Sequence, residues 1–408
     1  MNEVEETLRR TFGQAAEHAP RLPGMLPERL ERVHLRRRRR SRMALAAAAV
    51  VLVSGGTLAV VRGGETTTAV QGDVASQVRG EAPAEPVEKV WPEAVIKVAG
   101  KGYGGTAWRP ATVIDDRTVL MTTRDGFEST AAIYAYDLET AAQRKIADVP
   151  RPAGTVLFAS DFTVGGGHVA WWTATEDSVA HLWAVPLEGG EAKIVADQRV
   201  QVDDDGNLID GLGVVNDKIV FSVRPGGVFT VPLGGGTVEP IAESAGMHLL
   251  TWPWAGTPGP GGQPKTGPVG ERTEGPLYER IRNLETGETA TAVVHADEQL
   301  RSCGVRICLG TTTSGESFYR QRDGSQERKA IGHPFTLEPP TQDRFSFSSY
   351  GPQPAGVGLY DLVSGKSASL GIKPEGNSIR LPMADSTGRI LSYSLGDDLY
   401  MIDLSKIR

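Results

Sequence analysis

Cysteine is nearly absent from this chain, since only Cys303 and Cys308 occur among its 408 residues. Structural zinc sites use four thiol or imidazole ligands, and the residues around this pair supply no others. In an oxidising compartment, two cysteines this close together form a disulfide. The sequence therefore predicts a disulfide across residues 304–307 in preference to a metal site.

Catalytic motifs are also missing. The chain has no Gly-x-Ser-x-Gly turn of a serine hydrolase and no Gly-x4-Gly-Lys-Ser/Thr phosphate loop. Its seven histidines are scattered, and none of them forms the His-x3-His pair of a zinc enzyme. We therefore predict no catalytic residue, no cofactor and no enzymatic activity. A hydrolase whose site is assembled from distant loops stays an alternative.

One acidic stretch is a weak candidate for a metal site. Residues 203–207 read Asp-Asp-Asp-Gly-Asn, and Asp210 follows. Calcium needs several oxygen ligands at closely spaced alternate positions. In a calcium-loop register the first ligand position would be Gln201, and no glutamate follows at the required distance. Asp203, Asp205 and Asp210 are therefore weak metal candidates, and an Asp-Gly hairpin turn is the favoured interpretation.

Long apolar runs are absent except for residues 43–61, which hold no charged side chain. As a helix this run would span roughly 28 Å, close to the ~30 Å hydrocarbon core of a bilayer. Six arginines lie just before it within residues 36–42, and such a bias keeps the N-terminal side in the cytoplasm. We predict a single transmembrane helix, with the C-terminal part outside. A cleaved signal peptide is the alternative.

Charge separates the two sides of this predicted span. Residues 1–42 carry 11 Lys/Arg against 6 Asp/Glu, whereas residues 62–408 carry 32 against 44. The first segment is typical of a basic cytoplasmic tail with short helical patterns, which either sets topology or docks a cytoplasmic partner. The acidic outer part lacks the basic face that nucleic acid requires. Residues 62–89 are polar and rich in Gly, Thr and Pro, so we expect a flexible linker there.

Long helical patterns are missing past residue 90, where Gly and Pro separate short apolar strands. One unit recurs, in which an apolar strand precedes an aromatic-bearing strand that ends in Asp, Asn or Pro. These markers recur every 38 to 51 residues and are Asp137, Pro186, Pro232, Asn283, Asp323, Asp361 and Asp403. Units of this length with about four strands are typical of propeller blades. The sequence predicts an all-β fold over residues 90–408, a β-propeller of about seven blades, with six or eight possible. A β-sandwich is the alternative.

The two ends of the repeat region should complete one blade. The last copy ends at residue 408, just after its third strand, and an apolar strand at residues 94–98 precedes the first full copy. Pairing these ends would remove an open sheet edge. The fourth and fifth copies are degenerate. In the fourth we expect the second strand at residues 248–250 and an inserted Gly/Pro-rich loop at residues 253–276.

Tryptophan is sparse but grouped. Trp171, Trp172, Trp252 and Trp254 could line a funnel for sugars or peptides. Packing between blades is the favoured interpretation, because stacked sheets need large side chains in the gaps between them.

The chain resembles a group of actinobacterial single-pass membrane proteins. The likeness rests on the segment Leu8-Arg9-Arg10-Thr11-Phe12, the arginine run, the Ala/Val-rich span and the close cysteine pair. Such proteins carry a TolB-like or Trp-Asp-type propeller outside the membrane. The resemblance implies this architecture for the chain, in a bacterial cell membrane, and implies no activity.

The leading functional prediction is a non-enzymatic, membrane-anchored propeller that binds a protein or cell-envelope ligand outside the cytoplasmic membrane. It rests on a repeat scaffold without a nucleophile, base or metal cluster at motif spacing. The alternative is a transmembrane sensor or regulator whose residues 1–35 contact a cytoplasmic partner.

Overall fold

The structure is a computed structural model. It describes residues 85–102, 105–124, 130–200, 209–224, 226–259, 277–330, 333–334, 339–350, 356–374 and 379–408. The predicted cytoplasmic tail and the predicted span at residues 43–61 lie outside these ranges. Within them, no helix has the length and apolar character needed to cross a bilayer.

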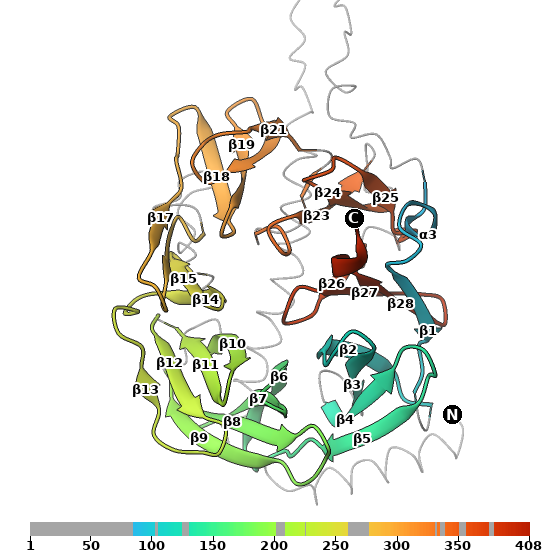
Figure 1. Cartoon of the computed structure of the whole chain (residues 1–408), viewed down its shortest axis with the longest axis vertical. Helices are drawn as coiled ribbons and strands as arrows, with labels where there is room; N and C mark the ends of the chain where they lie inside the picture. Colours follow the sequence, from blue (N-terminus) through green and yellow to red (C-terminus); the bar gives the residue numbers. More distant parts are fainter. Residues whose placement is uncertain are drawn as a thin grey trace, which may run out of the picture. The chain divides into compact units, whose positions relative to one another are not determined.

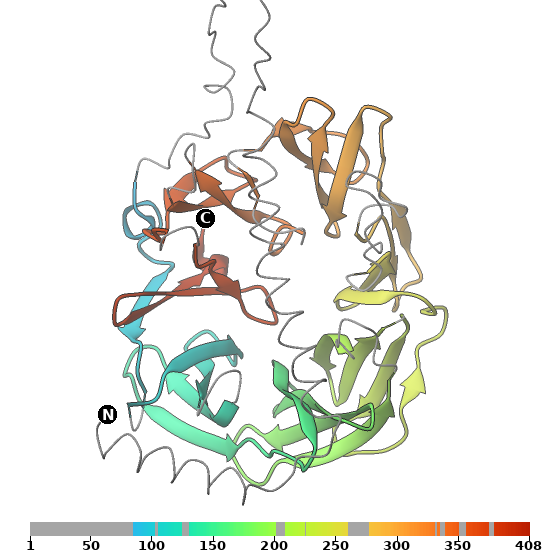
Figure 2. The same ribbon diagram turned by 180° about the vertical axis from the view of Figure 1, so that it is seen from behind.

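In the described part of the chain, seven four-stranded antiparallel sheets form a ring, so this part is an all-β, seven-bladed β-propeller. Figure 1 and the view from behind in Figure 2 both show the sheets following one another around the ring in chain order. In each sheet the strands run from the innermost to the outermost in sequence order, apart from the last blade. The predicted β-propeller is confirmed with seven blades, and the transmembrane helix and cytoplasmic helical segment predicted before it lie outside the described residues.

The strands of each blade, from the innermost outwards, have the following bounds. Blade 1 comprises β2 (Trp108–Val113), β3 (Thr118–Arg124), β4 (Thr130–Asp137) and β5 (Gln143–Asp148), and blade 2 comprises β6 (Thr155–Gly165), β7 (His168–Thr175), β8 (Val179–Pro186) and β9 (Lys193–Arg199). Blade 3 comprises β10 (Ile209–Val215), β11 (Lys218–Val223), β12 (Val228–Pro232) and β13 (Glu239–Pro240), and blade 4 comprises β14 (His248–Thr251), β15 (Trp254–Thr257), β16 (Arg280–Asn283) and β17 (Thr289–Thr291). Blade 5 comprises β18 (Glu298–Cys303), β19 (Ile307–Thr312), β20 (Ser317–Gln321) and β21 (Arg328–Lys329), and blade 6 comprises β22 (His333–Pro334), β23 (Phe345–Tyr350), β24 (Gly356–Asp361) and β25 (Ser367–Ser369). Blade 7 comprises β26 (Met383–Ala384), β27 (Ile390–Leu395), β28 (Asp398–Asp403) and β1 (Val95–Ala99).

Burial follows each strand's position in its sheet. The second strand β7 is buried at nearly every residue, because both faces of a blade pack against neighbouring blades. The outermost strand β9 is mostly exposed. Trp171 is fully buried between blades 1 and 2, and Trp172 is buried between blades 2 and 3. These two tryptophans pack between blades as predicted, whereas Trp252 and Trp254 are half-buried.

Six of the seven predicted marker residues end the third strand of their blade, whereas in blade 5 this strand ends at Gln321 and the predicted marker Asp323 lies two residues beyond it. Asp137, Asn283 and Asp361 each accept backbone N–H groups from residues two or three positions ahead. Short polar side chains favour turns for this reason. The residue after the marker donates its own N–H to the carbonyl just before the second strand, as in Leu138 to Arg117. This leucine-to-carbonyl bond recurs in six blades, at Leu138, Leu187, Leu233, Leu284, Leu362 and Leu404.

Blade 4 differs from its predicted layout. Residues 248–250 belong to the innermost strand β14, and the second strand is β15 at Trp254–Thr257. Only residues 252–253 connect the two strands. The predicted inserted loop 253–276 therefore begins too early, because the Gly and Pro residues near this strand give it the composition of a loop. Residues 260–276 lie outside the described residues.

The ends of the chain close the ring in blade 7. Strand β1 pairs antiparallel with β28, with Val95 opposite Ile402 and Ala99 opposite Asp398. The predicted strand 94–98 is thereby confirmed. Just before it, the short helix α3 (Val87–Val90) contributes Val87 to the core of blades 6 and 7, and Ser369 donates its N–H to the Glu85 carbonyl. Residues 85–89 are therefore part of the propeller rather than of the predicted linker.

Residues 85–94, which we call the entry segment, pack against blades 6 and 7. We predict that Val87→Ala lowers the free energy of unfolding by about 2 kcal/mol, because Val87 has no exposed surface and its methyl groups fill the contact between the entry segment and these blades. Chemical denaturation measures this change. Val363→Ala is the matched control, since Val363 is 59% exposed. Equal stabilities of the two variants would contradict a packed entry segment.

Arginine–carboxylate pairs join the second and third strands in blades 1, 6 and 7. In blade 7, Arg389 donates from Nε and from one terminal nitrogen to both oxygens of Asp403, at 3.0 and 2.9 Å. Burial of Asp403 opposes its ionisation, but hydrogen bonds from Arg389 and Ser405 outweigh this and hold its pKa below the ordinary value. The pair therefore stabilises the fold only while Asp403 is ionised.

We predict that Asp403→Asn destabilises the protein by about 2 kcal/mol at pH 7, because charged hydrogen bonds to Arg389 are weakened. Because the folded-state pKa is lower than the unfolded value of ~3.9, this contribution is complete above that pH and disappears as the pH falls through the folded-state pKa. Thermal unfolding of wild type and variant from pH 7 to pH 2 should show the two curves converging. A constant difference over this range would contradict the assignment.

Candidate functional site

The connections between strands differ at the two ends of the blades. Connections between the first and second strands, and between the third and fourth, leave at one end, which we call the turn end. Connections between the second and third strands, and between blades, leave at the opposite end, which we call the loop end. The long connections 200–208, 258–279 and 370–382 all belong to the loop end. Binding residues in repeat scaffolds concentrate on such connections.

A group of charged and polar side chains lies on the inner strands of blades 1 to 4. We call it the inner polar cluster, and its members are Arg109, Asp161, Asp210, Ser222, Arg224 and His248. Asp210 and His248 lie at the start of β10 and β14, and Ser222 lies near the end of β11. These positions are at the loop end. Neighbouring innermost strands pack together, which brings residues far apart in sequence into one place.

Asp210 is the centre of this cluster. Its Oδ1 accepts from the Ser222 hydroxyl at 2.6 Å, and its Oδ2 is 2.5 Å from His248 Nδ1. Burial opposes ionisation of Asp210, but the bonds to His248 and Ser222 and the charge of Arg224 hold its pKa below the ordinary value. The carboxylate is therefore ionised and ties blades 3 and 4 together.

Ser222 is not arranged as a nucleophile. In a hydrolytic triad the serine hydroxyl contacts the imidazole, which removes its proton. Here the hydroxyl donates to the carboxylate instead, and its oxygen accepts the Leu249 N–H at 3.0 Å. Ser222 and His248 both form hydrogen bonds with Asp210. This arrangement of serine, histidine and aspartate stabilises the contact between strands and does not activate the serine as a nucleophile.

Asp161 is the exposed member of the cluster. Strand β6 departs from regular pairing on both sides of it, and Asp161 itself has a φ of 54°. Bulges of this kind re-aim a side chain away from the ladder. Trp172 Nε1 donates to Asp161 Oδ2 at 2.7 Å. Desolvation by the surrounding protein atoms raises the pKa of Asp161, and the negative charge of Asp210 adds to this effect. The hydrogen bond from Trp172 and the positive charge of Arg109 oppose it.

In this cluster the Asp161 carboxylate faces solvent, whereas the charged side chains of Asp210 and Arg224 are buried. Such a surface can hold a ligand through hydrogen bonds and charge complementarity. Sequence reasoning missed Asp161, Ser222, Arg224 and His248, because they come from different blades and form no motif.

The predicted metal candidates do not assemble within the described part of the chain. Asp203 and Asp205 lie outside it, and Asp210 is directed at Ser222 and His248. Over the described residues, no three His, Cys, Asp or Glu side chains are grouped in a way that could hold a metal ion.

The cysteine pair lies in blade 5. Cys303 and Cys308 are opposite each other in β18 and β19, both are buried, and their sulfurs are at disulfide distance. The enclosed turn is held from blade 6 by Asp343, whose carboxylate accepts the N–H groups of Arg306 and Ile307. The predicted disulfide therefore stands at a junction of blades.

Arg322 occupies the position that leucine holds in the other six blades. Its backbone N–H makes the same bond, to the Arg306 carbonyl, but its side chain is buried. The guanidinium donates to the carbonyls of Tyr278 and Glu279 in blade 4 and to those of Val305 and Gly304 in the disulfide turn. Burial lowers the pKa of Arg322 to about 10, which leaves it charged at neutral pH.

No protein-family model and no curated protein sequence matches the chain. Similar solved structures include an uncharacterised protein from Listeria monocytogenes, at 12% identity and a TM-score of 0.42, covering 74% of this chain and 93% of that one. BamB from Moraxella catarrhalis is 12% identical with a TM-score of 0.35, covering 76% and 91%. An oligogalacturonate lyase from Vibrio parahaemolyticus is 11% identical with a TM-score of 0.40, covering 76% and 91%. Since each TM-score lies below 0.5, functional arguments rest on the chain's own residues.

We predict that Arg322→Leu destabilises the protein by at least about 2 kcal/mol, although it restores the leucine of the other blades. The four carbonyl groups that accept hydrogen bonds from the Arg322 guanidinium would lose this donor in the interior of the protein. Thermal and chemical unfolding measure the effect, with Arg328→Leu on exposed β21 as control. A more stable Arg322→Leu variant would show that the repeat pattern outweighs the buried network.

Proposed function

We propose that the chain is a non-enzymatic, membrane-anchored propeller that binds a protein or cell-envelope ligand outside the cytoplasmic membrane of a bacterium. The anchor is the apolar run at residues 43–61, and the arginines before it hold the N-terminal side in the cytoplasm. The propeller then lies in the extracytoplasmic compartment, where the disulfide between Cys303 and Cys308 persists.

The observation that carries the proposal is the inner polar cluster at the loop end. Asp161 is exposed on the innermost strand of blade 2 and is coupled to the buried Asp210 of blade 3. Long connections of several blades leave from the same end. A rigid scaffold that presents charged groups among loops is suited to recognition. The bonding of Ser222 to Asp210 favours binding over hydrolysis.

A second candidate is a transmembrane sensor. The specific observation is that the ring-closing strand β1 is the first strand after the segment that leads from the predicted span. A displacement of residues 85–94 would act on β1 and on the contact of Glu85 with Ser369 in blade 6. In this case residues 1–35 contact a cytoplasmic partner.

Crosslinking in living cells, followed by purification of the tagged full-length protein, tests the binding proposal. We expect Asp161→Asn to reduce recovery of the extracytoplasmic partner at least fivefold, because the exposed charge of the inner polar cluster is removed. Asp148→Asn is the matched control, since Asp148 is exposed on the outermost strand β5 of blade 1 and should leave recovery unchanged. Equal recovery with both variants would contradict the assignment of the inner polar cluster.

A variant that lacks residues 2–30 but keeps the arginine run separates the two candidates. Unchanged envelope partners with this variant favour the binding protein. Loss of a cytoplasmic partner that full-length protein recovers favours the sensor.

A further inference from the structure

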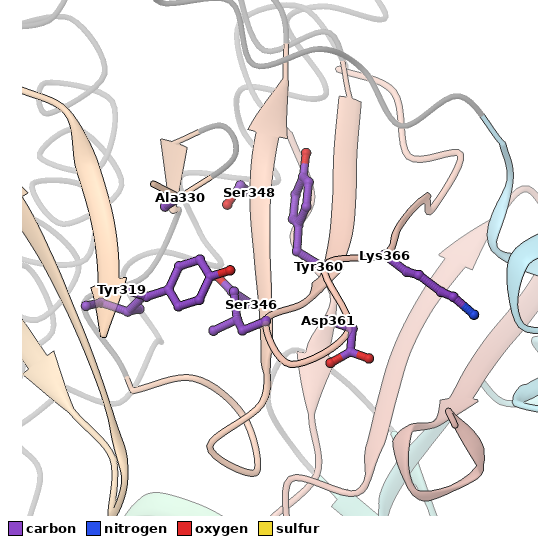
Figure 3. Close-up of a pocket in the computed structure, with 10 residues that line it drawn as sticks. Tyr319, Ala330, Ser346, Ser348, Tyr360, Asp361 and Lys366 are labelled. Carbon is purple, nitrogen blue, oxygen red and sulfur yellow. The ribbon is translucent and has the colours of Figure 1, made fainter. Parts of the chain in front are cut away.

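The cavity between blades 5 and 6 is too small to hold a ligand. It lies between β19 and β20 on one side and β23 and β24 on the other, and its volume of about 20 Å³ leaves room for about one water molecule. Figure 3 shows the Tyr360 hydroxyl directed away from Lys366, which lies at the exposed rim. This contact therefore contributes packing between the blades and offers no binding site.

A chain of hydrogen bonds links four polar side chains of blade 2. His181 of β8 lies directly opposite Asp197 of β9, and its Nδ1 is 2.6 Å from Asp197 Oδ1. His181 Nε2 is 3.1 Å from Oγ1 of Thr175, the last residue of β7. The Thr175 hydroxyl donates to Oδ1 of Asp177, in the β7–β8 turn, at 2.6 Å. We call these four residues the His181 network, and they join three strands and one turn of the blade.

The His181 network is not a catalytic triad, although a hydroxyl, an imidazole and a carboxylate follow one another in it. In a triad the hydroxyl donates to the imidazole, which removes its proton. Here the hydroxyl of Thr175 has a shorter contact with Asp177 than with His181. The Val179 carbonyl is a further acceptor, at 3.4 Å. The network therefore does not activate Thr175 as a nucleophile.

The donors and acceptors of the network fit one protonation state of the imidazole. The hydrogen bond from Thr175 holds the pKa of Asp177 below its ordinary value, so this carboxylate is ionised and only accepts. Because the single hydroxyl proton of Thr175 is donated to Asp177, the Thr175 oxygen can only accept from His181 Nε2. An ionised carboxylate at Asp197 likewise only accepts from Nδ1. Both ring nitrogens therefore need a proton, as in the imidazolium cation.

We propose that His181 is doubly protonated in the folded protein and acts as a pH-sensitive latch between β9 and the β7–β8 turn. The imidazolium donates from Nδ1 to Asp197 and from Nε2 to Thr175. When the proton on Nε2 is lost, this nitrogen and the Thr175 oxygen face each other as two acceptors. Either the hydroxyl then turns away from Asp177 or the imidazole turns away from Thr175. The latch therefore holds in the cationic state and releases the end of β9 as the pH rises.

Other charged groups near His181 come from the β7–β8 turn, from β9, from β5 of blade 1, which packs against β8, and from the connection after β5. They are Glu176, Asp177, Asp197, Arg199, Arg144, Lys145, Asp148 and Arg151. Lys145 pairs with Asp148 at 2.7 Å, Arg144 donates to the Leu187 carbonyl, and Arg151 lies over the Phe158 ring. Arg199 acts on Asp177. Asp197 is the charged group in direct contact with the imidazole, and an opposite charge at this distance favours the imidazolium.

Nitrogen-15 NMR of the purified full-length protein with labelled histidine tests the protonation state. At pH 7 a histidine in solution is mostly neutral. We expect both ring nitrogens of His181 to carry a proton at this pH, and His181→Gln identifies their signals by removing them. Thr175→Val keeps the shape of the side chain but removes the oxygen that accepts from Nε2, so His181 should be mostly neutral in this variant. A bare ring nitrogen at His181 in wild type, or double protonation that persists in Thr175→Val, would overturn the inference.

Thermal unfolding between pH 6 and pH 9 tests the release of the latch. If the folded state favours the charged imidazole, its contribution to stability is complete below the unfolded value of ~6.5 and disappears as the pH rises further. The difference in melting temperature between wild type and Thr175→Val should therefore shrink by about twofold or more over this range. A difference that stays constant with pH would contradict the latch.

His168→Gln is the matched control. His168 lies in the same blade, and its Nδ1 contacts the Gly166 carbonyl rather than a carboxylate. The difference in melting temperature between this variant and wild type should stay constant from pH 6 to pH 9.

The inference goes beyond the proposed function and does not depend on it. Partner recovery with Asp161→Asn measures recognition by the inner polar cluster. The ring-nitrogen signals of His181 report the latch whether or not a partner is recovered, so the two proposals fail separately.

Discussion

The pairing of β1 with β28 is the constraint on which the rest of the structure depends. The two strands come from opposite ends of the described chain, and no turn connects them. Without β1, the third strand β28 of blade 7 would be an open edge, and blade 7 would lose Val95 and the buried side chains Val87, Trp91 and Ala94 of the entry segment. Every other blade holds its outermost strand through its own chain connection. Closure of the ring is thus the least local interaction in the fold, and it is made by the segment nearest the predicted membrane anchor.

Once the ring is closed, buried polar groups define how neighbouring blades fit. Asp210 joins His248 across blades 3 and 4, and Arg322 joins the carbonyls of blade 4 to the disulfide turn of blade 5. These groups have partners and so fix the relative placement of the sheets. A few other buried polar atoms, among them the Tyr360 and Tyr393 hydroxyls, have no hydrogen-bond partner among the described residues.

Much of the fold could be predicted from sequence because a propeller repeats. The markers Asp137, Asp361 and Asp403 predict the ends of third strands for a physical reason. Their side chains accept hydrogen bonds from the backbone N–H groups of the turn that follows. Prediction failed in blade 4, where two short strands flank residues 252–253 and the apolar stretch at His248 looked like the second strand. It also placed residues 85–89 in a linker, because one buried valine in a four-residue helix leaves no periodic pattern.

The candidate sites were beyond sequence reasoning for a different reason. The inner polar cluster joins residues of blades 1 to 4, and only the ring geometry shows that Asp161 and Asp210 influence each other. The disulfide could be predicted because its partners are close in sequence, with Cys303 and Cys308 at the two sides of one turn.

Hydrogen exchange of the full-length protein, followed by mass spectrometry, tests the central claim most directly. If β1 closes the ring, its bonded amides exchange as slowly as those of the outer strand β9, and they open together with β28 under increasing denaturant. Exchange in β1 that is orders of magnitude faster than in β9, with β28 still protected, would show that blade 7 is stable with three strands. That result would contradict a propeller that is held together by its joined chain ends.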